Sequence, residues 1–223
     1  MHNVLENLLS IEKNIKSRID ELKLQNYKPN IVAVSKTFSM KDILPLINHG
    51  HIHFGENKVQ EAIEKWSSIK DDFQHIKLHM IGKLQTNKVK NVIPLFDYIH
   101  SLDSLKLAKK ISNEEKKKNK KLKIFIQINI GNEDQKSGIS IDSLSNFYNI
   151  CTKELDLNII GLMCLPPLDS NPEKYFKLLK KTAENLNLKE LSMGMSADYE
   201  QAILNGSTYL RLGTLILGKR DLI

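Results

Sequence analysis

Hydrophobic and polar positions follow one repeated order along the chain, in which a short apolar run precedes a segment with helical spacing. Eight apolar runs rich in Ile, Val, Leu and Phe have the length of strands, and the segments between them place apolar residues three or four positions apart. This order in 223 residues predicts a closed parallel (β/α)₈ barrel, with an open doubly wound sheet as the alternative. The predicted strands span 30–36, 51–55, 76–82, 97–102, 123–130, 158–165, 190–194 and 208–213.

The ends of the chain fit the same architecture. Residues 1–25 predict an amphipathic helix before the first strand, and the chain stops soon after the eighth. We therefore expect the N-terminal helix to occupy the place in the outer ring that a final helix would otherwise fill. No linker or change of composition divides the sequence, so residues 1–223 are expected to form a single domain.

Alternation within the strands predicts which side chains enter the barrel. In the fifth strand Ile124, Ile126 and Ile128 form a stripe suited to packing under helices, so the residues between them point inward. The polar inward residues lie in the second half of their strands, the end where barrels of this class carry their sites. The expected inward residues are Phe125, Gln127, Asn129, Tyr209, Arg211, His79 and, on the face of Val32 and Val34, Lys36.

The net charge of +7 raises the possibility of a nucleic-acid partner, but only three of the 33 basic residues are arginine. The lysine-rich run at 113–123 contains no aromatic residue for base stacking and is typical of the solvated end of a helix. We expect no specific nucleic-acid partner. No apolar run has the length of a membrane helix and no signal peptide is visible, so a cytoplasmic protein is expected. Cys151 and Cys164 are expected to be free thiols.

A histidine cluster raises the alternative of a metal site. His51 and His53 share a strand face, whereas His49 lies at a helix end, and Glu56 is the one carboxylate nearby. This set does not complete a convincing metal shell. We expect surface and loop histidines and no bound metal.

Lys36 ends the first strand at the expected mouth of the barrel. A partly desolvated lysine beside other cations has a lowered pKa, and its neutral amine can form a Schiff base with a ketone or with pyridoxal phosphate. A phosphate site would favour pyridoxal phosphate over a ketone. Barrels of this class bind phosphate in the loops after strands seven and eight. There Ser196 is a natural N-cap, Gly213 permits close approach of an anion, and Thr214 offers an N–H and a hydroxyl.

Seven stretches of the chain carry a resemblance to a known family, at 33–37, 54–61, 79–88, 127–138, 161–166, 191–203 and 206–221. In these stretches, which run in family order, the chain resembles the YggS/PROSC family of pyridoxal-phosphate-binding homeostasis proteins. Members of that family are single-domain barrels similar to the N-terminal domain of bacterial alanine racemase. Lys58 and Leu217 depart from the family, which often has tyrosine and phenylalanine, respectively, at these two positions.

The resemblance also implies how the cofactor, pyridoxal 5'-phosphate, is bound. Lys36 is implied to carry it as a Schiff base, and Arg211 to lie near the pyridine nitrogen. Asn57 and His79 are implied to line the pocket. The phosphate is implied to be held by Ser196, Gly213 and Thr214.

An arginine facing the pyridine nitrogen disfavours carbanion chemistry, because a guanidinium only donates and leaves the ring a poorer electron sink. Alanine racemase has a second acid–base residue, a tyrosine from an extra domain, and we expect no such domain in this chain. The resemblance therefore implies a monomer that buffers the cofactor and delivers it to apo-enzymes, without strong catalytic activity and with no catalytic residue assigned. The alternatives are a small fold-type III racemase or decarboxylase, and a Schiff-base aldolase without cofactor.

Overall fold

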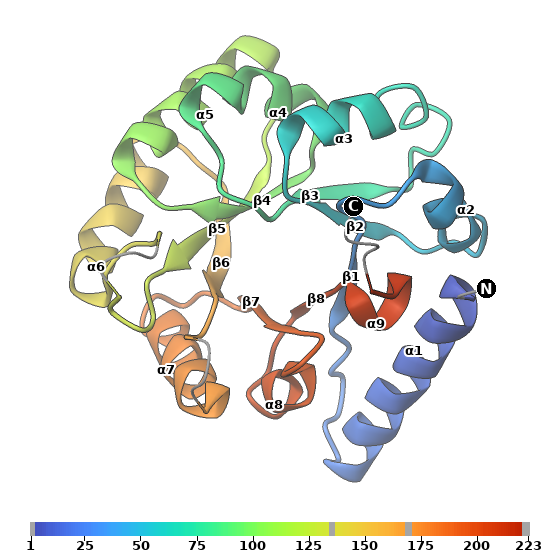
Figure 1. The fold of residues 1–223 in the computed structure, drawn as a ribbon. Coiled ribbons are helices and arrows are strands. Elements are labelled where there is room, and N and C mark those ends of the chain that lie inside the picture. The colour runs from blue at the N-terminus through green and yellow to red at the C-terminus, as the bar shows by residue number, and fades with distance from the viewer. Residues whose placement is uncertain (1–2, 134–136, 168–170, 220–223) are drawn as a thin grey trace.

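The computed structural model describes residues 3–133, 137–167 and 171–219, which form a closed barrel of eight parallel strands (Figure 1). Each strand pairs with the next along the chain, and β8 closes the barrel by pairing with β1. The predicted fold class is confirmed. The strands are β1 (Asn30–Val34), β2 (His53–Glu56), β3 (Lys77–Met80), β4 (Tyr98–Leu102), β5 (Lys123–Ile128), β6 (Ile159–Cys164), β7 (Glu190–Met195) and β8 (Tyr209–Leu212).

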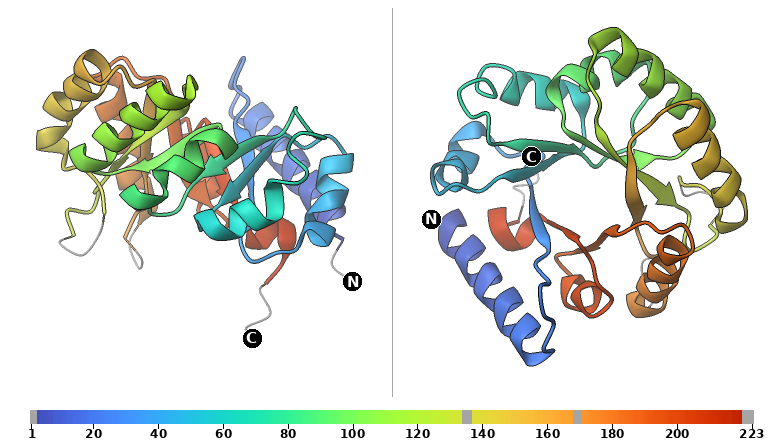
Figure 2. Two further views of the ribbon diagram at one scale, coloured as in Figure 1. Left: turned by 90° about the horizontal axis from the view of Figure 1, so that it is seen from above. Right: turned by 180° about the vertical axis from the view of Figure 1, so that it is seen from behind.

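Helices surround the barrel as an outer ring, seen end-on from both sides in Figures 1 and 2. Helix α1 packs against α9 and α2, so it fills the place in the ring that was predicted for it. No helix in the described part of the chain is long and apolar enough to cross a membrane. The α-helices are α1 (Val4–Glu21), α2 (Met40–Asn48), α3 (Val59–Trp66), α4 (Val89–Leu95), α5 (Leu105–Lys118), α6 (Ile141–Asn149), α7 (Pro172–Glu184), α8 (Tyr199–Leu204) and α9 (Thr214–Leu217).

Two shorter helical segments complete these elements. The 3₁₀-helix η1 (Thr86–Lys88) leads into α4, and the π-helix η2 (Ile150–Glu154) continues α6. Helix α4 contains Pro94 in its last turn, and its buried residues keep the helical spacing. Residues 134–136 and 220–221 of the family-like stretches lie outside the described residues.

The hydrophobic residues form two cores that match the predicted alternation. One lies between the sheet and the helices and includes Ile124, Ile126 and Ile128. The other fills the barrel itself, and burying each of its large side chains contributes about 1.5–3 kcal/mol. The members of this interior core are Val32, Tyr98, Phe125, Met163 and Tyr209, so the predicted inward positions of Phe125 and Tyr209 are confirmed.

The lysine-rich run ends a helix, as predicted, but one side of it is buried. Helix α5 ends at Lys118, and its C-cap Asn119, which lies within the run, has a left-handed φ of 47°. Glu115 is 1% exposed and accepts a hydrogen bond from the backbone N–H of Leu122. The cysteines are free thiols, as expected, and both are buried.

Candidate functional site at the mouth of the barrel

Lys36 lies two residues beyond the end of β1, in a turn at the carboxyl end of the barrel. Its side chain is half-buried. The next residue, Thr37, has a left-handed φ of 69°, which is costly for a β-branched side chain. Ser35 stays in register with β2, because its N–H donates to the carbonyl of Gly55 at 3.0 Å. The backbone at Lys36 is therefore held in a strained turn that neighbouring contacts must maintain.

A buried carboxylate fixes the strand that carries Lys36. Glu56 is fully buried, and its Oε1 accepts hydrogen bonds from Ser35 Oγ at 2.8 Å and Lys65 Nζ at 2.9 Å. It accepts a third from Trp66 Nε1 at 3.0 Å. The side chain of Lys65 is only 8% exposed. This ion pair is shielded from water, so removal of either partner would leave the other as an unpaired buried charge.

Two further contacts extend this network across Lys36. Lys65 Nζ also donates to the carbonyl of Ser35 at 2.8 Å, and the N–H of Thr37 donates to Glu61 Oε1. Glu61 pairs in turn with Lys65 at 3.1 Å. The residues on both sides of Lys36 are thus tied to α3. Sequence reasoning missed this network, although Glu61 and Lys65 have the i, i+4 spacing of a helical ion pair.

The loop after β7 differs in one detail from the prediction. Ser196 was expected to cap α8, but the residue before that helix is Asp198, whose Oδ1 accepts from the N–H of Met195 at 2.6 Å. Ser196 is two positions too early, because the chain first makes a turn. Its Oγ instead accepts a hydrogen bond from the N–H of Leu215 at 3.4 Å. Ser196 therefore joins the loop after β7 to the segment after β8.

Gly213 lies at the start of α9, beside the end of β1. A Cβ there would be 3.5 Å from the Cβ of Val34, an ordinary contact, and the φ of −110° is open to any residue. The local fold therefore does not itself require glycine at this position. The phosphate cradle at Gly213 and Thr214 therefore stays a prediction.

Arg211, one residue before the end of β8, spreads its guanidinium across neighbouring strands at the mouth. Its Nη1 donates to Ser192 Oγ at 2.6 Å and its Nη2 donates to the carbonyl of Cys164 at 2.9 Å. The side chain is buried, and desolvation lowers its pKa. No ion pair found among the described residues involves Arg211. A buried cation with only neutral partners is suited to an acceptor group of a ligand.

His79 does enter the barrel, as predicted, but its ring nitrogens are committed within the protein. Nε2 lies 2.9 Å from His53 Nδ1, and Nδ1 lies 2.8 Å from His100 Nε2. The ring is fully buried and stacks on Tyr98 with 4.1 Å between centroids. It therefore has no free nitrogen for a direct polar contact with a cofactor.

The expectation of surface and loop histidines is wrong for His53. His53 begins β2, is half-buried and bonds His79 inside the barrel. The single-sequence pattern could not show this contact, because it joins different strands. In the described residues no three metal-ligating groups lie together.

The remaining family-like positions surround the mouth. Asn57 follows β2 directly, and the loop after β3 passes so close that a Cβ on Gly82 would be 2.3 Å from the carbonyl oxygen of Asn57. Lys58 is exposed at the start of α3. Leu217 is 3% exposed and belongs to the core between sheet and helices.

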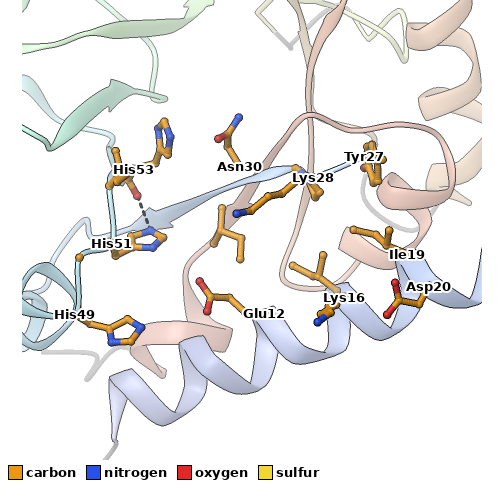
Figure 3. Close-up of a pocket in the computed structure, with 15 residues that line it drawn as sticks. Glu12, Lys16, Ile19, Asp20, Tyr27, Lys28, Asn30, His49, His51 and His53 are labelled. Atoms are coloured by element: carbon orange, nitrogen blue, oxygen red, sulfur yellow. Dashed lines mark hydrogen bonds between the residues drawn. The ribbon is translucent and has the colours of Figure 1, made fainter. Parts of the chain in front are cut away.

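A cavity of about 710 Å³ lies elsewhere, at the amino ends of β1 and β2 beside α1 (Figure 3). Its charged lining is mixed, because Glu12 and Asp20 face Lys16 and Lys28. We place the candidate site at the opposite end, since Lys36, the buried guanidinium of Arg211 and the joined loops after β7 and β8 are all there.

Comparison with known proteins identifies the family. Residues 7–221 match the family model described as alanine racemase, N-terminal domain. The pyridoxal phosphate homeostasis protein of Aquifex aeolicus (strain VF5) is 34% identical over 227 residues, covering 98% of this chain and 99% of that protein. The protein of that name from Escherichia coli (strain K12) is 32% identical over 230 residues, covering 99% and 98%. This chain belongs to the family of pyridoxal phosphate homeostasis proteins.

Solved structures agree with the family. PipY of Synechococcus elongatus PCC7942, solved with PLP bound, has a TM-score of 0.80 at 31% identity, covering 92% of this chain and all of that one. Alanine racemase of Clostridium difficile 630 has a TM-score of 0.73 at 15% identity, covering 98% of this chain and 57% of that one, a likeness that shows the fold alone. The family and the alanine racemase-type barrel expected from the sequence are both confirmed.

Proposed function

We propose that this protein binds pyridoxal 5'-phosphate at the mouth of the barrel, as a Schiff base on Lys36, and acts in intracellular cofactor homeostasis. In this role it buffers the cofactor and delivers it to apo-enzymes. The names of the family members and the solved PipY with PLP bound support the proposal. The observation that carries it is the meeting of Lys36, buried Arg211 and the joined loops after β7 and β8 at one end of the barrel.

The residues at the mouth fit this cofactor. Ser196, Gly213 and Thr214 would hold the phosphate, because the hydrogen bond between Ser196 and Leu215 joins the loop after β7 to the segment after β8. Arg211 would donate to the pyridine nitrogen from a guanidinium that β6 and β7 hold in place. Asn57 would line the wall of the cofactor pocket beside β2. His79 would make no direct polar contact with the cofactor, because both of its ring nitrogens are bonded to other histidines. When bound, the cofactor supplies an aldehyde that reacts reversibly with the amine of Lys36.

The groups around Arg211 favour binding over amino-acid chemistry. Arginine stays charged and only donates, so it does not promote protonation of the pyridine nitrogen. Tyr209 lies inside the barrel with its hydroxyl 3.4 Å from that of Tyr98, and burial raises its pKa. Burial also raises the pKa of the Cys164 thiol to about 12. Neither group is suited to exchange a proton with a substrate at neutral pH.

Borohydride reduction of the purified protein loaded with pyridoxal phosphate tests the proposal. We expect a yellow protein whose visible absorption disappears on reduction, with the added mass on the peptide that contains Lys36. A colourless protein, or a label on another lysine, would overturn the assignment.

Two solution assays separate homeostasis from catalysis. We expect the loaded protein to pass its cofactor to an apo-enzyme, as measured by recovered apo-enzyme activity. We expect no rapid deuterium exchange at the α-carbon of added amino acids. Rapid exchange would instead support a racemase, and a protein that retains all its cofactor would contradict the delivery role.

A further inference from the structure

A continuous row of hydrogen-bonded side chains runs through the barrel to Arg211. It begins at His53, the first residue of β2, and continues through His79 on β3 and His100 on β4. His100 Nδ1 lies 2.7 Å from Ser192 Oγ on β7, which accepts from Arg211. We call these four residues before Arg211 the histidine row. It connects the amino end of the barrel, where His53 lines the large cavity, with the guanidinium at the mouth.

Arg211 determines the direction of the first link, because a guanidinium can only donate. Ser192 Oγ therefore accepts from Arg211, and its own hydrogen needs an acceptor, since this side chain is fully buried. Within the described residues the hydroxyl contacts only Arg211 and His100. The hydroxyl of Ser192 thus donates to Nδ1 of His100.

The direction of each remaining hydrogen bond in the histidine row follows from the one before it. A neutral imidazole has one donor and one acceptor nitrogen, so a His100 that accepts on Nδ1 donates from Nε2 to His79 Nδ1. His79 then donates from Nε2 to His53 Nδ1. Burial lowers the pKa of His79 and of His100 well below its ordinary value, and the charge of Arg211 adds to this at His100. The opposite direction would leave the buried hydroxyl hydrogen of Ser192 without an acceptor.

We propose that the histidine row is a neutral positioning device for Arg211, in which every hydrogen bond points away from the guanidinium and each histidine carries its hydrogen on Nε2. The acceptor side of each member then faces the buried cation, so that oriented dipoles stabilise a charge with which no carboxylate of the described residues forms an ion pair, while Asp198 acts on it through its charge alone. A carboxylate in their place would neutralise the guanidinium that we place beside the pyridine nitrogen. Ser192, His100 and His79 are positioning residues, and their link to cofactor binding rests on the proposed function.

The first experiment determines, in the protein without cofactor, which ring nitrogen of each histidine carries the hydrogen. Long-range ¹H–¹⁵N NMR on protein labelled at histidine distinguishes a protonated Nε2 from a protonated Nδ1. We expect His53, His79 and His100 each to be neutral, with the hydrogen on Nε2. A hydrogen on Nδ1 of His79 or His100 would overturn the proposal.

The second experiment breaks the link to Arg211. In Ser192→Ala we expect His100 to lose its single Nε2–H form and the dissociation constant for pyridoxal phosphate to rise about tenfold, because a charge-assisted hydrogen bond is lost. Tyr209→Phe is the matched control, since it removes another buried hydroxyl from the same interior, and should change neither. Equal effects of the two variants would contradict the positioning role.

The two experiments distinguish this proposal from the proposed function. If the parent protein binds no pyridoxal phosphate, the proposed function fails while the NMR result still decides the direction of the row. If it binds the cofactor but the hydrogens lie on Nδ1, the row fails and the function stands.

Discussion

The substitution Lys65→Met tests whether the buried ion pair holds the strand that carries Lys36. Methionine keeps most of the apolar stem but removes the ammonium, which donates to Glu56 Oε1 at 2.9 Å and to the carbonyl of Ser35 at 2.8 Å. Glu56 is fully buried, so its carboxylate cannot recover these contacts from water. It would keep only its hydrogen bonds from Ser35 and Trp66.

The expected cost is large because the pair is shielded. Removing one partner of a buried ion pair costs about 3–5 kcal/mol, against roughly 5–15 kcal/mol for the whole stability of a typical domain. In a chain of this size such a loss corresponds to a melting temperature lower by roughly 6–20 °C. The matched surface pair Lys177–Glu173, at 2.7 Å, has side chains that are 66% and 40% exposed. Lys177→Met should therefore cost under about 0.5 kcal/mol.

Urea denaturation of the parent and both variants measures these free energies of unfolding. The double variant Lys65→Met with Glu56→Gln should recover part of the loss, because the unpaired charge is also removed. The affinity of Lys65→Met for pyridoxal phosphate should fall as well, since the carbonyl of Ser35 loses a contact next to Lys36. If Lys65→Met costs no more than Lys177→Met, the argument from burial is refuted.

The remaining predictions concern the mouth, the thiols and the pH dependence of stability. Gly213→Ala should leave the free energy of unfolding within about 1 kcal/mol of the parent, since its φ is permissive, yet weaken pyridoxal phosphate binding in an absorbance titration; unchanged affinity would contradict the cradle. Cys151 and Cys164 are buried, with pKa values raised to about 12, so a thiol reagent should label them only after unfolding, and rapid labelling of the folded protein would contradict this. Burial lowers the pKa of His51 and of His53 from 6.5 to about 4, so the unfolded chain takes up protons at a higher pH than the folded protein does. The free energy of unfolding should therefore fall as the pH drops from about 6.5 to about 4, by up to about 1.4 kcal/mol per pH unit for each histidine. Urea titrations at a series of pH values check this, and a flat profile would contradict it.

The barrel could be predicted because its signals are local and repeated. Alternation along β5 and β8 correctly placed Phe125 and Tyr209 inside, since a strand with helices on one side and the barrel interior on the other has two distinct faces. Ser196 was misassigned as a cap because a suitable residue type does not reveal how many residues a turn takes before its helix.

The contacts that the sequence could not reveal join strands far apart in the chain. His100 and Ser192 are 92 positions apart but 2.7 Å from each other, and nothing near either residue indicates the other. Glu56 also resembles an ordinary strand-end residue until Lys65 and Trp66 are seen to converge on one of its oxygens. Such partners become visible only when the barrel is closed.

An absorbance titration of Lys36→Ala with pyridoxal phosphate shows whether the cofactor is bound through Lys36. Lys41→Ala is the matched control, because Lys41 is an exposed lysine in the helix that follows the same turn. We expect the control to develop the visible band of the parent, whereas Lys36→Ala does not and shows no borohydride-trapped cofactor. A Lys36→Ala variant that binds the cofactor and develops the same band as the parent would rule out the Schiff base on Lys36.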